Sequence, residues 1–347
     1  METHFPNCTK ADHLTRTPFT PKHLRPNLDK VKYITQQRVQ WSINTFKPNK
    51  SAGLDGITPL ALQKLGPRMI KRITYFYKKS VIAGYVTTPL CESKVIFIPK
   101  GGRDDYTVPK AFRPISLTSY LLKVLERVIL NELETNHLIN NPLSRDQHAF
   151  RKGSSCESAL SDMVDYIEKS IYRNEYAVGV FLDITGAFDN LCLRAADRGM
   201  MRLKVPTPIR KWYNNYLNNR MARADLKGCQ SSARLTKGTP QGGVLSPLIW
   251  NMAFDEFLLL FKRGPIHAIE FADDGALMVC GKDPCTITSI LQKGIDKTTR
   301  WGEENGLTFG IAKTSAVVFT HKYTAEKPFT SLKLNGEPLP FTRRVKW

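Results

Sequence analysis

Apolar residues recur every three or four positions over long stretches of the chain, which is the spacing of an amphipathic helix. We expect helices over about residues 29–46, 67–83, 119–137, 155–172, 191–202, 207–218, 246–261 and 283–305, with a short one beginning near Thr58-Pro59. Shorter runs of β-prone residues predict strands over 94–100, 176–183 and 315–320.

The strands and helices are mixed without strict alternation, which favours an α+β fold: a small antiparallel sheet with helices on one face. A length of 347 residues allows about two domains. We expect residues 1–28 to form a basic, Pro-rich and poorly ordered tail.

Two apolar stretches, residues 266–270 and 276–280, flank Asp273-Asp274-Gly275. This pattern predicts a β-hairpin with two adjacent carboxylates at its tip. Like charges this close repel and raise each other's pKa. A divalent cation makes the arrangement favourable, because Mg²⁺ prefers carboxylate oxygens and completes its shell with phosphate. Taken alone, the motif also fits an acidic, solvent-exposed turn.

The net charge changes this picture. The chain has 51 Lys and Arg against 31 Asp and Glu, a formal charge of +20 with a pI of about 9.7. An excess of this size along the chain indicates a polyanionic partner, nucleic acid before membrane.

Other bulk features exclude several classes of protein. The seven cysteines are scattered without a Cys-x-x-Cys pair, which indicates a reduced, intracellular protein without a disulfide framework or zinc knuckle. The sequence contains no run of about 18 apolar residues, so no transmembrane helix is expected. The polar first ten residues lack the apolar core of a signal peptide.

Three stretches form an ordered set along the chain: a strand ending in Asp183 and followed by Phe188-Asp189, the loop Pro240-Gln241-Gly242, and Asp273-Asp274. Together with residues 52–57, 95–100, 112–117, 238–247, 306–307 and 313–314, they resemble reverse transcriptases of non-long-terminal-repeat retrotransposons, of the jockey-like and ribosomal-DNA-inserting kinds. The resemblance covers about residues 47–347. It implies a right-hand polymerase with a palm at 176–347, fingers and an N-terminal extension at 29–175, and a reverse transcriptase domain at about 80–347.

The resemblance also implies the reaction, in which a DNA 3′-hydroxyl is extended on an RNA template. Two Mg²⁺ ions, with Mn²⁺ as a substitute, would activate the attacking oxygen and stabilise the leaving one. By this resemblance Asp183, Asp273 and Asp274 are the metal ligands, with the carbonyl of Ile184 as a helper.

The remaining site residues are also carried over by resemblance. Phe188 matches the ring beneath the sugar that would collide with a 2′-hydroxyl, and Gln241 and Gly242 match the loop that abuts the incoming nucleotide. Arg113 and Lys100 are candidates for contacting the triphosphate. Lys313 matches a lysine proposed to protonate the leaving pyrophosphate, although Gly310 replaces the family's usual Asn three residues earlier. Without the family, core packing explains Phe188 and a solvated charge explains Lys100.

Two other functions stay open. A catalytically silent or truncated remnant would bind nucleic acid through its charge, and a lost catalytic acid would identify it; all three acids are present. A group II intron-type reverse transcriptase or a telomerase is a near neighbour.

We further expect an RNA–DNA hybrid and deoxynucleoside triphosphates as partners, no membrane association, and a nuclear location during integration. The oligomeric state is unknown from the sequence. The sequence ends at Trp347, about where the family enters its thumb, so we expect a truncated chain of fingers and palm that synthesises only short products.

Overall fold

The computed structural model describes residues 4–5, 28–102, 104–226, 228–321 and 329–345. The backbone divides into two compact units, each discontinuous in sequence. Unit 1 contains residues 1–142 and 188–250, whereas unit 2 contains residues 143–187 and 251–347.

The expected boundary between residues 175 and 176 does not coincide with this division, and the assignment of fingers and palm stays a prediction. The predicted tail over 1–28 falls outside the described residues except for 4–5 and 28.

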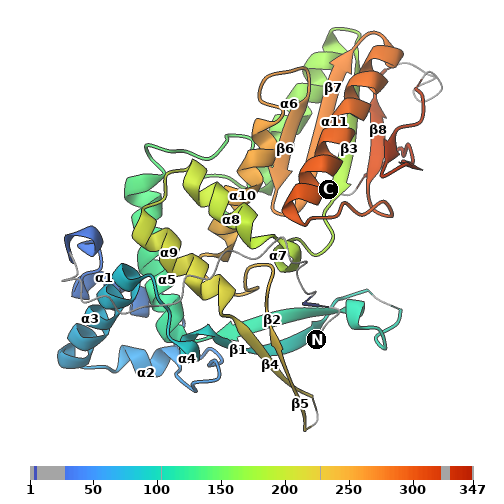
Figure 1. Ribbon diagram of the computed structural model, residues 1–347. Helices are drawn as coiled ribbons and strands as arrows, with labels where there is room; N and C mark the ends of the chain where they lie inside the picture. Colours follow the sequence, from blue (N-terminus) through green and yellow to red (C-terminus); the bar gives the residue numbers. More distant parts are fainter. Residues whose placement is uncertain (1–3, 6–27, 103, 227, 322–328, 346–347) are drawn as a thin grey trace. The chain divides into compact units, whose positions relative to one another are not determined.

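Unit 1 combines helices with a mixed sheet (Figure 1). Its described helices are α1 (Gln36–Asn44), α2 (Pro59–Gln63), α3 (Pro67–Ala83), α4 (Thr88–Cys91), α5 (Tyr120–Glu132), α8 (Leu193–Arg202) and α9 (Thr207–Asn218). Its strands are β1 (Glu92–Pro99), β2 (Phe112–Thr118), β4 (Met221–Leu226) and β5 (Cys229–Arg234). They pair in the order β2-β1-β4-β5, in which β1 and β4 are parallel and the other neighbours antiparallel. The helices α7 (Ala187–Asn190) and α10 (Ser246–Leu259) contain residues of both units.

The single helix predicted over residues 29–46 is wrong. A 3₁₀ turn at Leu28–Val31 is followed by Thr35 in extended conformation, with ψ of 160°. The Thr35 side chain accepts a hydrogen bond from the backbone N–H of Arg38, so Thr35 is the N-cap at which α1 begins. The β4–β5 hairpin was not predicted because β5 consists of small and polar residues without an apolar alternation.

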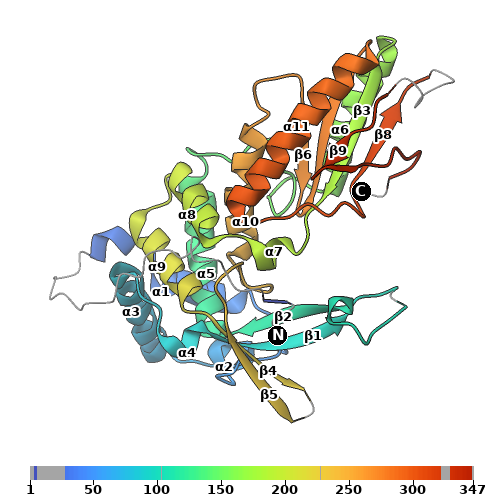
Figure 2. The same ribbon diagram turned by 45° about the vertical axis from the view of Figure 1, so that its right-hand side comes forward.

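Unit 2 is built on an antiparallel sheet with the strand order β6-β7-β3-β8 (Figure 2). Its described elements are α6 (Cys156–Tyr172), β3 (Tyr176–Asp183), β6 (His267–Phe271), β7 (Asp274–Gly281), α11 (Pro284–Asn305), β8 (Ser315–Phe319), β9 (Lys333–Leu334) and β10 (Glu337–Pro338). The predicted strand over 176–183, the acidic hairpin and the strand after α11 are confirmed, and so is the mixed fold with a small antiparallel sheet.

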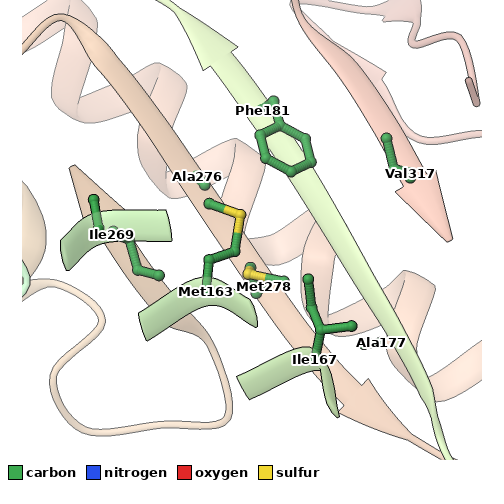
Figure 3. Close-up of a cluster of buried hydrophobic side chains, with 9 residues drawn as sticks. Met163, Ile167, Ala177, Phe181, Ile269, Ala276, Met278 and Val317 are labelled. Atoms are coloured by element: carbon green, nitrogen blue, oxygen red, sulfur yellow. The ribbon is translucent and has the colours of Figure 1, made fainter. Parts of the chain in front are cut away.

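Helices cover both faces of this sheet, and the prediction that they cover only one is wrong. Met163 and Ile167 of α6 pack on the face that carries Ala276 and Met278 (Figure 3). On α11, a Cβ added to Gly294 would lie 3.6 Å from Leu277, the residue between Ala276 and Met278. Successive residues of a strand point to opposite faces, so α6 and α11 lie on opposite sides.

The composition of β3 carries the signal for this two-sided burial. Seven of its eight residues are buried, from Tyr176 to Leu182. A strand that is apolar without alternation is buried on both faces. β3 is therefore an interior strand of the sheet, and its last residue, Asp183, is only partly buried.

None of the helices in the described ranges is long and apolar enough to span a membrane.

Candidate active site

The tip of the β6–β7 hairpin is the dipeptide Ala272-Asp273, because Phe271 pairs directly with Asp274. Ala272 has a φ of 62°, in the left-handed region. Positive φ at the first residue of a two-residue loop matches the twist of antiparallel strands. A residue with a Cβ pays about 1–2 kcal/mol for this conformation, and such strain clusters at functional sites.

Asp183 and Asp274 lie directly opposite each other in the sheet. Asp183 ends β3, Asp274 begins β7, and the two residues are register partners in the antiparallel pair. Directly opposed residues have Cβ atoms only about 4.5–5.5 Å apart. The fold therefore brings together carboxylates that are far apart in the sequence, and the hairpin places Asp273 beside them.

Mutual repulsion is visible in the electrostatics of Asp274. Partial burial raises the pKa of its carboxyl, and the charges of Asp273 and Asp183 raise it further. The charge of Lys313 opposes this rise. Closely spaced carboxylates of this kind are stabilised in the ionised form when a cation binds them.

A turn formed by residues 308–314 holds the end of β3. The N–H of Gly310 donates to the carbonyl oxygen of Asp183 at 2.8 Å, and the N–H of Asp183 donates to Oγ1 of Thr314 at 3.3 Å. Lys313 Nζ lies 2.8 Å from Asp183 Oδ1 and forms an ion pair with it. Ile184 is buried and bridges to Phe309 of the same turn.

Gly310 is one of the residues of this turn that lie close to Asp183. A Cβ added there would lie 2.9 Å from Asp183 Oδ2 and 3.1 Å from Thr185 Oγ1. The absence of a side chain therefore leaves room for the Asp183 carboxylate where the resembling family carries Asn.

The carboxylates suit a hard cation. Within the described ranges, no three His, Cys, Asp or Glu side chains form a ready-made metal cage. Mg²⁺ does not require one, since it is usually held by one or two carboxylates and completes its shell with water and substrate phosphate. The opposed pair Asp183 and Asp274, with Asp273 adjacent, fits this binding mode.

Phe188, Gln241 and Gly242 belong to unit 1. The ring of Phe188 stacks on Trp250 with ring centroids 5.5 Å apart. The backbone carbonyl oxygen of Phe188 accepts a hydrogen bond from the Thr239 N–H at 2.8 Å. The Ser116 N–H of β2 donates to the carbonyl oxygen of Gln241 at 2.9 Å. Gly242 has a φ of 110°, and a Cβ there would lie 3.0 Å from Ser116 O, so the loop depends on glycine at this position.

Arg113 and Lys100 lie at one end of the β1–β2 hairpin, also in unit 1. Arg113 is exposed and pairs with Ile98 in the register, whereas Lys100 follows β1 and donates from Nζ to the carbonyl oxygen of Lys110 at 3.0 Å. The positive charge of Lys100 also acts on Asp189, where it lowers the carboxyl pKa against the larger effect of burial.

The segment of residues 146–148, which supports strand β6, was not predicted from the sequence. The Glu270 N–H donates to the carbonyl of Asp146 at 2.9 Å, and the His148 N–H donates to the carbonyl of Glu270 at 3.0 Å. Between them, the amide of Gln147 donates to the Glu270 carboxylate, and both side chains are fully buried. The sequence signal for this contact was Glu270, an acid within an apolar strand, because a buried carboxylate requires a buried hydrogen-bond donor.

Glu126 is a second carboxylate missed from the sequence. It is fully buried in α5, and its Oε2 accepts a hydrogen bond from the Val244 N–H at 3.0 Å. Burial raises its pKa from the ordinary 4.5 to about 7, against the opposing effect of this hydrogen bond and the charge of Lys123. It therefore anchors the segment that leads from Gly242 into α10.

We expect Glu126→Gln to change how stability depends on pH. The folded-state pKa is raised, so the stability tied to the neutral form is present below about pH 4.5 and is lost as the pH rises through about 7. The Gln variant still offers an oxygen to the Val244 N–H but carries no charge. Its unfolding free energy relative to wild type should therefore rise between pH 5 and pH 8 in denaturant titrations, and a pH-independent difference would contradict the assignment.

Comparison with known proteins identifies the family. The reverse transcriptase (RNA-dependent DNA polymerase) family profile matches residues 98–335, more than half of the chain. The RNA-directed DNA polymerase from the mobile element jockey of Drosophila funebris is 25% identical over 322 residues, covering 90% of this chain and 34% of that protein.

Two further relatives are Pol polyproteins of type-1 retrotransposable elements. The Pol polyprotein of the type-1 retrotransposable element R1 of Bradysia coprophila is 24% identical over 350 residues, covering 100% of this chain and 33% of that protein. That of element R2 of Popillia japonica is 26% identical over 330 residues, covering 90% of this chain and 44% of that protein. The chain thus spans about a third of the length of the first relatives it matches.

Among solved structures, apo telomerase from Candida tropicalis truncated from its C-terminal domain aligns with a TM-score of 0.48 and 12% identity, over 73% of this chain and 56% of that one.

The carboxylates at the ends of β3 and β7, in a chain matched by the family profile over residues 98–335, lead to one conclusion: this chain belongs to the reverse transcriptase family.

Proposed function

We propose that the chain extends a DNA 3′-hydroxyl on an RNA template, as the polymerase part of a longer retrotransposon protein. The observation that supports this most is the register pairing of Asp183 with Asp274, with Asp273 adjacent at the hairpin tip. Reverse transcriptases use divalent metals, and for this chain we propose two Mg²⁺ ions, which Mn²⁺ can replace. The partners are an RNA–DNA hybrid, which suits the +20 charge, and deoxynucleoside triphosphates.

Asp183, Asp273 and Asp274 would hold the metal ions, with the backbone carbonyl of Ile184. When bound, these ions would lower the pKa of the attacking hydroxyl and neutralise charge on the phosphates. Lys313 is held beside Asp183 with Nζ at 2.8 Å, a position that suits a proton donor to the departing pyrophosphate.

The residues of unit 1 would select and orient the nucleotide. Arg113 would contact the triphosphate through charge-assisted hydrogen bonds, with a weaker contribution from Lys100. Phe188 would exclude the 2′-hydroxyl, while Gln241 and Gly242 would bring the loop backbone close to the nucleotide. For the longer protein we also propose an intracellular location, in the nucleus during integration.

Primer extension by the 347-residue chain tests this proposal. We expect Mg²⁺-dependent incorporation of deoxynucleotides on an RNA template, and none with Asp273→Asn. Hybrid binding without incorporation would instead identify a catalytically silent nucleic-acid-binding protein. Equal DNA synthesis by wild type and Asp273→Asn would contradict the catalytic assignment.

Gly310→Ala should slow this reaction by displacing Asp183. The added Cβ would lie 2.9 Å from Asp183 Oδ2, so the carboxylate must move. A displacement of about 1 Å in a catalytic group can cost about 100-fold, and we expect a loss of about 10- to 100-fold in incorporation rate.

Gly281→Ala is the matched control for Gly310→Ala. Gly281 lies at the other end of β7, where an added Cβ makes ordinary contacts of 3.4 and 3.6 Å with Ile287. This variant should retain near-normal activity. Wild-type activity in Gly310→Ala would show that the turn does not constrain Asp183.

A further inference from the structure

The loop formed by residues 238–243 has a backbone fixed from several sides. The Gly238 N–H donates to the carbonyl of Leu191 at 2.7 Å, and the Ser116 N–H donates to the carbonyl of Gln241 at 2.9 Å. A Cβ on Gly238 would lie 2.4 Å from the carbonyl oxygen of Phe188. With the backbone held so closely, the chief freedom left to Gln241 is the orientation of its side-chain amide.

Asp189 removes this freedom. Gln241 Nε2 donates to Asp189 Oδ2 at 2.8 Å. An ionised carboxylate only accepts hydrogen bonds, whereas an amide has a donating and an accepting end. Asp189 therefore binds the NH₂ end of Gln241 and leaves Oε1 as the end that is available to another molecule.

The surroundings of Asp189 act on its ionised form in opposite directions. Burial raises the pKa of its carboxyl to about 7, against the charges of Arg220 and Lys100 and the hydrogen bond from Gln241. Arg220 is itself buried, and its guanidinium donates to the carbonyls of Lys237 and Gly238 at 2.5 and 2.6 Å. A fixed positive charge thus lies at the start of the loop and favours the ionised, accepting form of Asp189.

We propose that Asp189 is a positioning residue for nucleotide selection: it fixes the amide of Gln241 so that Oε1 accepts a hydrogen bond from the incoming deoxynucleoside triphosphate. This inference rests on the proposed function, and it adds a residue that would not touch the nucleotide itself. Its effect should appear in nucleotide affinity, because the ordering of the amide is completed before the nucleotide binds.

Steady-state incorporation by four proteins tests this: wild type, Asp189→Leu, Gln241→Ala and the double variant. In Asp189→Leu we expect the KM for deoxynucleotides to rise about tenfold, with kcat changing less than about threefold. In the Gln241→Ala background, Asp189→Leu should change KM less than about twofold, because each single substitution already removes the same Asp189–Gln241 hydrogen bond.

A matched control separates positioning from stability. Asp197 of unit 1 also accepts a side-chain amide, that of Asn214 at 2.6 Å, and pairs with Arg210. Asp197→Leu should lower the melting temperature and leave the KM for deoxynucleotides unchanged. Asp189→Asn, which keeps an acceptor but also offers a donor, should give an intermediate KM.

The outcomes separate the two proposals. Normal wild-type incorporation with additive effects of Asp189→Leu and Gln241→Ala would overturn the positioning role alone, as would a lower melting temperature with unchanged KM. A wild-type chain that binds hybrid but never incorporates nucleotide would overturn the polymerase function, and with it any role in nucleotide selection.

Discussion

Asp183→Asn should reduce nucleotide incorporation by at least about a thousandfold. The carboxylate of Asp183 faces Asp274 across the sheet and pairs with Lys313 at 2.8 Å, so it is the member of the acidic group that contacts both the hairpin and the proposed proton donor. Metal-based stabilisation of the transition state is worth several kcal/mol, and each 1.4 kcal/mol or so corresponds to about tenfold in rate. Asn keeps the size of the side chain and removes its charge.

Asp165→Asn provides the control for this substitution. Asp165 is exposed on α6, where it forms a surface ion pair with Lys169. The change removes one negative charge from the same unit and should leave incorporation within about twofold of wild type, because exposed pairs contribute little. Single-turnover incorporation with saturating hybrid measures both variants. A loss below tenfold in Asp183→Asn would contradict its role as a metal ligand.

Phe188→Ala should relax the choice of sugar by about 100-fold. The ring is held in place by its stack on Trp250, and its backbone is tied to the 238–243 loop through Thr239. Since the 2′-hydroxyl is the group that distinguishes a ribonucleotide, removal of a ring that blocks it should raise the relative rate of ribonucleotide incorporation.

The readout for Phe188→Ala is the ratio of kcat/KM for a deoxynucleotide and its ribonucleotide. This ratio does not depend on the fraction of protein that is folded. That matters because replacing the Phe188 ring by a methyl group leaves a gap beside Trp250, which can destabilise the fold. Phe76→Ala, at a half-exposed ring of α3, is the control and should leave the ratio unchanged. An unchanged ratio in Phe188→Ala would remove this residue from the sugar-binding site.

The elements predictable from sequence were those with a strong local pattern. β3 ends at Asp183 as predicted, because its apolar run and terminal acid are both visible in the sequence. The hairpin around Asp273 was equally clear. The interruption of the helix before α1 was not predicted, because the apolar spacing continues across it. It depends on Thr35, which caps α1 by accepting a hydrogen bond from the Arg38 N–H.

The supporting contacts of the candidate site were not predictable in the same way. Gln147 and Glu270, or Asp189 and Gln241, are far apart in the sequence and meet only through the fold. A polar residue within an apolar strand indicates that a hydrogen-bond partner exists, but it does not identify that partner. The roles given to Arg113, Lys100 and Lys313 stay predictions.

Iron-mediated cleavage of the chain tests most directly whether the acids hold a shared cation. Fe²⁺ substituted for Mg²⁺, with ascorbate and peroxide, cuts protein backbone close to where it binds. In the hybrid-bound chain we expect cuts near Asp183 and near Asp273 in the same sample, both suppressed by excess Mg²⁺ and both lost in Asp183→Asn. Cleavage at only one of the two positions, or an unchanged pattern in Asp183→Asn, would contradict a metal site shared by the β3 and β7 carboxylates.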